Sequence, residues 1–243
     1  MAKNENWDAL PQVLLPWYAE NRRQLPWRED RKPYHIWLSE IMLQQTRVEA
    51  VKGYYSRFLA ALPDIRSLAE CDDEVLHKLW EGLGYYSRVR NLKKCAQVIV
   101  NQYGGVFPRE YAQVLSLPGI GPYTAGAICS IAFNQPTPAV DGNVLRVISR
   151  LRNDPAPIDL PETKQNVTEF LAGIYPPQAG DFTQALMELG ATVCGPNRKP
   201  DCEGCPCKTF CLAFLEGDPQ SLPVKSPKKG RKSEDLTVFI LSC

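Results

Sequence analysis

Four cysteines fall within eighteen residues near the C-terminal end of the chain, and they constrain its fold more than any other feature. Cys194, Cys202, Cys205 and Cys211 have the spacing C-x7-C-x2-C-x5-C. A C-x2-C pair brings two thiolates together across one tight turn, and the flanking cysteines complete a four-thiolate set that suits a [4Fe-4S] cluster or a structural zinc ion. Disulfides are the alternative, but the opening MAKNENWDALPQVLL lacks the apolar run of a secretory signal. The spacing therefore predicts a metal site in a reducing compartment.

The remaining cysteines are not predicted to bind metal. Cys207 lies between two of the proposed ligands, but the pair at 202 and 205 has the better spacing. The others stand apart from the run and are interpreted as ordinary thiols: Cys71, Cys95, Cys129 and Cys243.

Size and composition place the chain among globular proteins. Its 243 residues can form one large domain or two closely packed ones, and a hydrophobic content of 44% is enough for a core. The net charge of +1 does not by itself indicate a nucleic-acid partner, but basic residues cluster at 22–32, 88–94 and 225–232. Each cluster could equally be a solvated face. Because no apolar stretch is long enough to span a bilayer, we expect a soluble, cytoplasmic protein with no membrane partner.

The hydrophobic pattern from residue 8 to 215 is helical and is interrupted by prolines and glycines rather than by alternating strands. It predicts an all-α fold. The expected helices lie at 8–22, 33–47, 48–60, 64–70, 72–80, 86–103, 108–115, 121–133, 143–152, 161–174 and 180–192. After residue 217 the composition changes. Residues 218–235 predict a solvated linker, and LTVFILSC at 236–243 predicts the first strand of a domain that is absent from this chain.

A glycine hairpin and an aspartate that follows it form the second strong signal. LSLPGIGPYTAGAI at 115–128 places Gly119 and Gly121 between two helices, where exposed backbone N–H groups suit phosphate oxygens. In PAVDGNVLRVISR, Asp141 stands just before a new helix, whose N-terminus keeps a carboxylate ionised and able to stabilise a cation. Both features also have a purely structural interpretation, as helix caps.

Together these motifs resemble the helix-hairpin-helix DNA glycosylase superfamily. LPGIGPYTAGAI, VDGNVLRV and the cysteine run carry this resemblance, while PWR, WLSEIMLQQTRV and WEGLGYYSRVRNL resemble the adenine DNA glycosylases in particular. The resemblance extends over residues 10–215. One departure is the spacing of the first two cysteines, which the family has as C-x6-C; the extra residue here lies in GPNRKPD, and a solvent loop can absorb it.

The chemistry of base removal identifies two carboxylates. Cleaving a purine from deoxyribose passes through an oxocarbenium-like transition state, so one carboxyl protonates the leaving base and another faces the positive charge. Glu40 shares its helix face with the apolar residues Ile36, Trp37 and Leu43, which should raise its pKa and make it the acid. A surface glutamate on an amphipathic helix is the alternative. The resemblance implies the same division: Glu40 protonates adenine N7 and later activates water, and Asp141 stabilises or traps the sugar cation.

Tyr123 distinguishes branches of the superfamily. The branch that resembles endonuclease III carries a lysine at this hairpin position, and a lysine amine can form a Schiff base with the sugar and then drive strand cleavage. Tyrosine cannot, so we predict a monofunctional enzyme that leaves an abasic site. The resemblance implies that Tyr123 contacts the catalytic aspartate and the sugar region. A structural tyrosine that caps the hairpin is the alternative.

The resemblance also implies DNA contacts, because an enzyme that acts on a base must flip it out of the stack. Residues that resemble the wedge around the opposite base are Gln45, Thr46, Leu83 and Tyr85. Residues that resemble the wall and the hydrogen-bonding part of the adenine pocket are Trp27, Arg28 and Gln184. Arg88 and Arg90 are interpreted as phosphate clamps. A position in the core or on a helix surface remains the alternative for each, above all for Leu83 and Gln184.

We therefore predict a two-lobed, all-α helix-hairpin-helix glycosylase with a C-terminal iron–sulfur loop. One lobe is a helical bundle at 30–135, the other joins 1–29 to 136–216 and holds the [4Fe-4S] cluster, and 217–243 is a linker with the start of a further domain. The predicted partner of this monomer is double-stranded DNA containing A:8-oxoguanine or A:G mispairs. A mismatch thymine or uracil glycosylase is one alternative, and a non-catalytic DNA-binding module is the other, although pure binding needs neither Glu40 nor Asp141.

Overall fold

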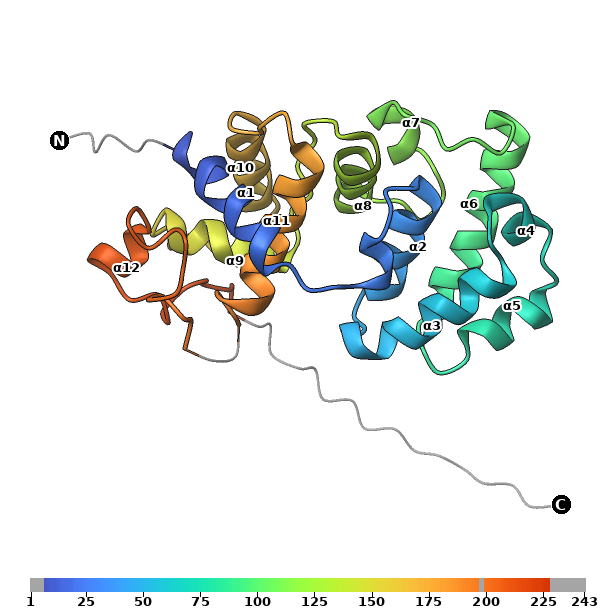
Figure 1. Ribbon diagram of the computed structural model, residues 1–243, viewed down its shortest axis with the longest axis horizontal. Helices are drawn as coiled ribbons and strands as arrows, with labels where there is room; N and C mark the ends of the chain where they lie inside the picture. Colours follow the sequence, from blue (N-terminus) through green and yellow to red (C-terminus); the bar gives the residue numbers. More distant parts are fainter. Residues whose placement is uncertain (1–6, 197–198, 228–243) are drawn as a thin grey trace, which may run out of the picture.

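The computed structural model describes residues 7–196 and 199–227, and within these ranges the fold is helical with no strands. Two hydrophobic cores divide it into two lobes, which lie at the right and left of Figure 1. The first core is built from η1 (Pro26–Arg28), α2 (Pro33–Leu43), α3 (Val48–Ala61), α4 (Ile65–Glu70), α5 (Asp73–Trp80), α6 (Ser87–Tyr103), α7 (Tyr111–Leu115), α8 (Pro122–Ala127) and the π-helical turn η2 (Ile128–Ala132).

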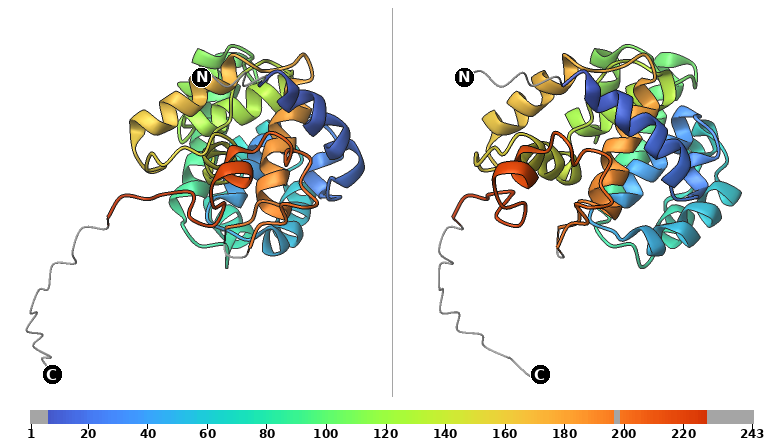
Figure 2. Two further views of the ribbon diagram at one scale, coloured as in Figure 1. Left: turned by 90° about the vertical axis from the view of Figure 1, so that its left-hand side faces the viewer. Right: turned by 60° about the vertical axis from the view of Figure 1, so that its left-hand side comes forward.

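The second core joins the N-terminal helix to the C-terminal half of the chain. Its elements are α1 (Ala9–Asn21), α9 (Gly142–Leu151), α10 (Pro161–Ala172), α11 (Ala179–Thr192) and α12 (Leu212–Glu216). Helix α11 contacts α1 and α9 within this lobe and η2 of the other, so it joins the two cores. Figures 1 and 2 show α1 beside α11 despite their separation in sequence. Leu25 and Trp27 pack into the first core, so part of the N-terminal segment belongs to each lobe.

The helix boundaries follow from local sequence signals. Prolines occupy the first position of α2, α8 and α10, where the missing N–H costs nothing. Asp64 caps α4 in a capping box with Ser67, and Asp72 caps α5 by accepting from the N–H of Glu74. Gly104 ends α6 in the left-handed conformation, with φ of 63°.

The predicted helices are found close to their expected limits, with two informative exceptions. Helix α2 ends at Leu43 rather than 47 because Gln45 adopts a left-handed backbone conformation with φ of 58°. The predicted helix at 121–133 changes from α8 to the π-helical turn η2. The short elements η1 and α12 were not predicted.

The segment after residue 217, which composition predicts as a solvated linker, lies partly against the second lobe. Leu222 is buried in the second core, and its carbonyl accepts a hydrogen bond from Arg150 Nε (3.0 Å). The N–H of Ile158 donates to Val224 O (3.0 Å), and the N–H of Ser226 donates to Asp159 Oδ1 (2.8 Å). The predicted strand at 236–243 lies outside the described residues.

No helix in the part of the chain that the structure describes is long and apolar enough to cross a membrane.

Candidate active site

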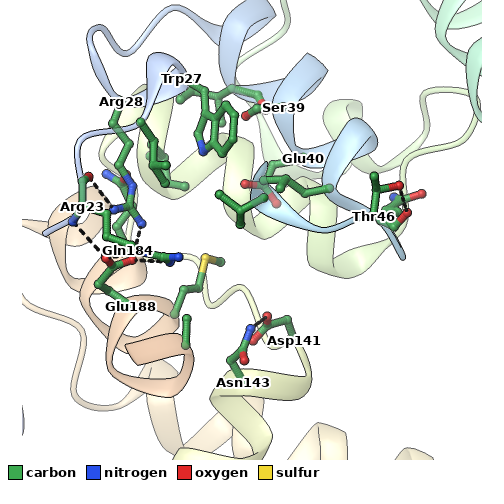
Figure 3. Close-up of a pocket in the computed structure, with 18 of the residues that line it drawn as sticks. Arg23, Trp27, Arg28, Ser39, Glu40, Thr46, Asp141, Asn143, Gln184 and Glu188 are labelled. Atoms are coloured by element: carbon green, nitrogen blue, oxygen red, sulfur yellow. Dashed lines mark hydrogen bonds and ion pairs between the residues drawn. The ribbon is translucent and has the colours of Figure 1, made fainter. Parts of the chain in front are cut away.

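A cavity of about 400 Å³ lies between the two lobes, a volume in the usual range for ligand sites. It is bounded by η1 and α2 of the first lobe, by the hairpin helix α8 with η2, and by α11 and the start of α9 from the second. The cavity brings together all three predicted catalytic residues, Glu40, Tyr123 and Asp141. Figure 3 shows Trp27 and Glu40 on one wall and Asp141, Asn143 and Glu188 across from them.

Glu40 is a buried acid on α2, a helix that is buried over most of its length. Glu40 is 7% exposed, and its neighbours on α2 from Ile36 to Met42 are buried as well. The interpretation as a surface glutamate is therefore excluded. Burial raises the pKa of Glu40 to about 7, although the hydrogen bond from Tyr123 opposes the shift. The nearby charge of Asp141 contributes to this upward shift, so Glu40 can hold its proton near neutral pH, as an acid catalyst requires.

Tyr123 makes its hydrogen bond to the acid, Glu40, whereas the resemblance implied a contact with the aspartate, Asp141, which lines the same cavity. Its hydroxyl donates a hydrogen bond to Glu40 Oε2 (2.5 Å), while Asp141 accepts hydrogen bonds from Asn143 and Val144. Burial and the two carboxylates raise the pKa of Tyr123 well above its usual value, so the phenol stays protonated and keeps donating. The geometry makes Tyr123 an orienting group for Glu40.

Asp141 caps α9 and points its carboxylate into the cavity. The N–H of Val144 donates to Oδ1 (2.7 Å) and Asn143 Nδ2 donates to Oδ2 (2.7 Å). The helix N-terminus was predicted to keep this carboxylate ionised, but burial raises the pKa of Asp141, and the hydrogen bonds from Val144 and Asn143 only partly offset that effect. Both carboxylate oxygens thus accept hydrogen bonds from the start of α9, and the carboxylate lines the cavity in which a cation would form.

An ion-pair cluster that sequence reasoning missed forms one wall of the cavity. Glu188 has no exposed side-chain surface and accepts from Arg23 Nε (2.7 Å), Arg23 Nη2 (2.9 Å) and Arg28 Nη2 (2.8 Å). Burial alone would raise the pKa of Glu188, but the hydrogen bonds from Arg23 and Arg28 lower it to about 2. Arg28, predicted to bind the base, lines the cavity but directs its charge to this carboxylate.

The other predicted pocket residues also line the cavity. Trp27 is 6% exposed and packs edge-on against Tyr55, so its ring is fixed in place. Gln184 projects from α11, held by a hydrogen bond of 3.4 Å from its Nε2 to Gly180 O. Thr46, predicted as part of the wedge, also lies on the rim of this cavity.

Of the four residues predicted to wedge into the DNA stack, two are exposed at the surface. Gln45 and Tyr85 are exposed, Tyr85 by 61%, and both adopt the left-handed backbone conformation, with φ of 58° and 47°. Leu83 is 6% exposed and packs in the first core. The structure therefore presents Gln45 and Tyr85 at the surface, whereas Leu83 takes the core position that was its alternative.

The two arginines predicted to bind phosphates, Arg88 and Arg90, differ in their exposure to solvent. Arg90 is exposed, as phosphate contact requires. Arg88 is only 8% exposed, and its guanidinium donates to chain carbonyls, so the prediction of a phosphate clamp is wrong for this residue. The sequence alone cannot show whether a basic residue near the start of a helix is exposed to solvent, like Arg90, or buried against backbone carbonyls of neighbouring segments, like Arg88.

The glycine hairpin lies at the surface beside α8. Gly119 has φ of 76°, and a Cβ there would stand 2.7 Å from Asn91 Cβ, so only glycine fits both the turn and the packing against α6. Gly121 is exposed and caps α8. The hairpin joins α7 to the helix that carries Tyr123, which fixes Tyr123 against Glu40.

The four cysteines of the predicted metal site line a single narrow cavity of about 20 Å³, whereas Cys207 is fully buried outside its lining. Arg150 Nη1 donates to Cys194 Sγ (3.1 Å), so α9 contacts this loop. Among residues 7–196 and 199–227, no three His, Cys, Asp or Glu side chains come close enough together to hold a metal ion. Four thiols around one cavity are nevertheless the donor set of an iron–sulfur cluster, so the residues fit such a group.

Comparison with known proteins agrees with this geometry. The model of the HhH-GPD superfamily of base excision DNA repair proteins matches residues 38–177. An adenine DNA glycosylase of Mus musculus is 47% identical over an alignment of 214 residues, and the match covers 83% of this chain and 41% of the mouse protein. An adenine DNA glycosylase of Buchnera aphidicola from Acyrthosiphon pisum is 39% identical over an alignment of 221 residues, and the match covers 90% of this chain and 63% of that protein. The chain therefore spans less than two thirds of the length of these relatives.

Solved structures give the same fold. A thermostable thymine-DNA glycosylase superposes with a TM-score of 0.80 at 30% identity and is covered over its full length, with 89% of this chain aligned. A non-covalent endonuclease III–DNA complex superposes with a TM-score of 0.73 at 22% identity, over 89% of this chain and 98% of that one. Because the family model matches more than half of the residues and the helical fold agrees throughout, the chain belongs to the HhH-GPD superfamily of base excision DNA repair proteins.

Proposed function

We propose that the chain is a DNA glycosylase that removes adenine mispaired with 8-oxoguanine or guanine. The observation that carries the proposal is the arrangement of Glu40 and Asp141 in one cavity, with Tyr123 donating to Glu40. The similarity to adenine DNA glycosylases from bacteria and mammals supports adenine as the base.

The two carboxylates divide the reaction. Glu40 gives its proton to the departing adenine as the bond from C1′ to the base nitrogen breaks and its electron pair leaves with the base. Asp141 faces the positive charge that develops on the sugar. Water then adds to C1′ and returns a proton to Glu40, which leaves an abasic site and restores the acid. Tyr123 holds the Glu40 carboxyl in one orientation throughout.

We further propose that the reaction stops at base removal. A lyase step requires an amine that attacks C1′. No lysine lines the cavity among the described residues, and the group nearest the acid is the phenol of Tyr123. The second candidate is a mismatch thymine glycosylase, supported by the 30% identity to such an enzyme.

A set of otherwise identical duplexes tests which base is removed. Single-turnover reactions would compare adenine, thymine and uracil placed opposite guanine or 8-oxoguanine. We expect cleavage after alkaline treatment only for the duplexes that contain mispaired adenine. Strand cleavage without alkali would contradict the monofunctional assignment, and faster removal of thymine would favour the second candidate.

The pKa shifts predict a bell-shaped dependence of the excision rate on pH. Burial raises the pKa of Glu40 to about 7, so the rate should fall as pH rises through this value and the acid loses its proton. The pKa of Asp141 is also raised, so the rate should fall on the acidic side as Asp141 becomes neutral. Single-turnover rates between about pH 4 and 9 would show both limbs. A rate that stays constant through neutral and alkaline pH would contradict the role of Glu40.

We propose that the four-cysteine cavity holds a [4Fe-4S] cluster through Cys194, Cys202, Cys205 and Cys211. The cluster, when bound, would cross-link the loop at 194–211 and fasten it to the second lobe. All four thiols line one cavity, and Cys207 does not, which supports this ligand set over others.

Replacing single cysteines tests the ligand set. Protein purified without oxygen should be brown and contain about four irons per chain. Cys205→Ser should lose most of the colour and the iron, whereas the neighbouring Cys207→Ser should keep both. A colourless protein with one zinc ion would rule out the cluster, and bleaching by Cys207→Ser would change the ligand assignment.

We also propose double-stranded DNA with a mispaired adenine as the partner, a monomeric state, a cytoplasmic location, and two lobes, one at 30–135 and the other formed by 1–29 together with 136–216. The two separate hydrophobic cores support these lobes. Exposed Arg90 and the surface hairpin at Gly119 and Gly121 are suitable phosphate contacts.

A further inference from the structure

Arg88 is a buried cation that the proposed chemistry does not use. It lies in the first turn of α6 and donates six hydrogen bonds to other parts of the chain. Nη1 donates to the carbonyls of Ile41 (2.9 Å), Met42 (3.0 Å) and Gln44 (2.7 Å). Nη2 donates to the carbonyls of Leu83 (2.9 Å) and Gly84 (3.2 Å) and to Thr46 Oγ1 (3.3 Å). The remaining N–H, on Nε, has no partner but is buried, so the guanidinium presents no donor at the surface for a phosphate.

These acceptors belong to two separate segments. The first is the end of α2, whose last carbonyls have no partner within the helix, and the turn that follows it. The second is the turn at Leu83 and Gly84, which leads into α6. One guanidinium therefore joins two turns that are about forty residues apart in sequence.

Each turn carries one exposed residue with a strained backbone. Gln45 lies between Gln44 and Thr46, which both accept from Arg88, and Tyr85 directly follows Gly84. The left-handed conformation is unfavourable for residues other than glycine, so it persists at Gln45 and Tyr85 only because the surroundings impose it. The Arg88 guanidinium also lies 5.6 Å from the centre of the Tyr85 ring. The bonds from Arg88 thus hold the strained turns in place.

We propose that Arg88 is a positioning residue that presents Gln45 and Tyr85 together for insertion into the DNA stack. This inference rests on the proposed glycosylase function and deepens it. Arg88 acts through the two turns and does not touch DNA. Its planar, forked guanidinium reaches six acceptors, and the three donors of a lysine cannot reproduce that geometry.

The test compares Arg88→Lys on two substrates. The first is an intact duplex with an A:G mispair, in which the stack must be opened. The second holds the same adenine inside an unpaired bubble, in which little opening is needed. We expect Arg88→Lys to slow single-turnover excision from the intact duplex by about tenfold or more, as for loss of hydrogen bonds to a charged group, and to slow the bubble far less.

A matched control variant and a comparison in a doubly substituted background distinguish a positioning role of Arg88 from a general loss of stability. Arg66 also donates to a backbone carbonyl, that of Gly104 (2.7 Å), but at a surface far from the site, so Arg66→Lys should leave both rates unchanged. In a Gln45→Ala/Tyr85→Ala background, Arg88→Lys should add little to the defect, because its effect passes through residues already removed. Arg88→Gln, which keeps two amide donors, replaces the lysine variant if that variant fails to fold.

Equal losses on the intact and bubble substrates would overturn the inference, because they would show that Arg88 supports Glu40 or the fold in general. Full additivity with the Gln45→Ala/Tyr85→Ala variant would overturn it too. An unmodified chain that releases no adenine from either substrate would overturn the proposed function and this inference with it.

Discussion

Glu40→Gln is expected to reduce the single-turnover rate of adenine release by about 10²–10⁴-fold, the usual contribution of a general acid. Glutamine has nearly the shape of glutamic acid and can still accept the hydrogen bond from Tyr123, but it has no acidic proton to give. Binding of the mismatched duplex should change little, because Glu40 lies inside the cavity and anchors no phosphate. The measurement is the excision rate at saturating enzyme beside a separate binding titration.

Glu169→Gln is the matched control, since Glu169 is an exposed glutamate on α10. It should retain the full rate. A Glu40→Gln variant with a near-normal rate would remove Glu40 from the mechanism, and a parallel loss of DNA binding would reassign it to recognition.

Asp141→Asn is expected to lower the same rate by about 10²–10³-fold, as for removal of a group aimed at the charge of a transition state. Asparagine is as good a helix cap as aspartate, and its side-chain oxygen can still accept from the N–H of Val144, so the start of α9 should be preserved. The variant therefore removes the charge facing the sugar with little change in structure. Thermal unfolding and excision rates should be measured on the same preparation.

Asp72→Asn makes the same change at the N-cap of α5, outside the cavity. We expect both asparagine variants to unfold at similar temperatures but only Asp141→Asn to lose activity. Equal activity of the two variants would show that Asp141 is merely a helix cap, the interpretation that its sequence position left open.

The sequence predicts much of the fold because the signals that build it are local. Asp64 and Asp72 cap the helices that were expected to start beside them, and prolines mark the starts of others. Glu40 could be identified because burial of a carboxyl among apolar residues is unfavourable, so a glutamate in an apolar helical run indicates a functional role. Glu188 carried the same signal, as the one acid in ALMELG, but its partners Arg23 and Arg28 are about 160 residues earlier in the chain.

The residues that sequence could not place depend on contacts between distant segments. From the sequence Arg88 is indistinguishable from a surface cation. Only the structure shows that its guanidinium donates to carbonyls at the end of α2 and in the turn at Gly84. Tyr123 lines the same cavity as the carboxylates of Glu40 and Asp141. The packing of α8 against α2 makes Glu40 the acceptor of its hydrogen bond, and this packing could not be predicted from sequence. Leu222 lies in a polar, proline-rich stretch, yet the second core buries it.

The proposal that this cavity releases adenine is tested most directly by identifying the free base. Duplex with a single A:G mispair would be incubated with excess protein, and the released bases would be separated by chromatography and identified by mass. The account predicts free adenine in an amount that approaches the duplex supplied, with none above background for Glu40→Gln. Release of thymine in place of adenine, or equal release of adenine by both proteins, would contradict it.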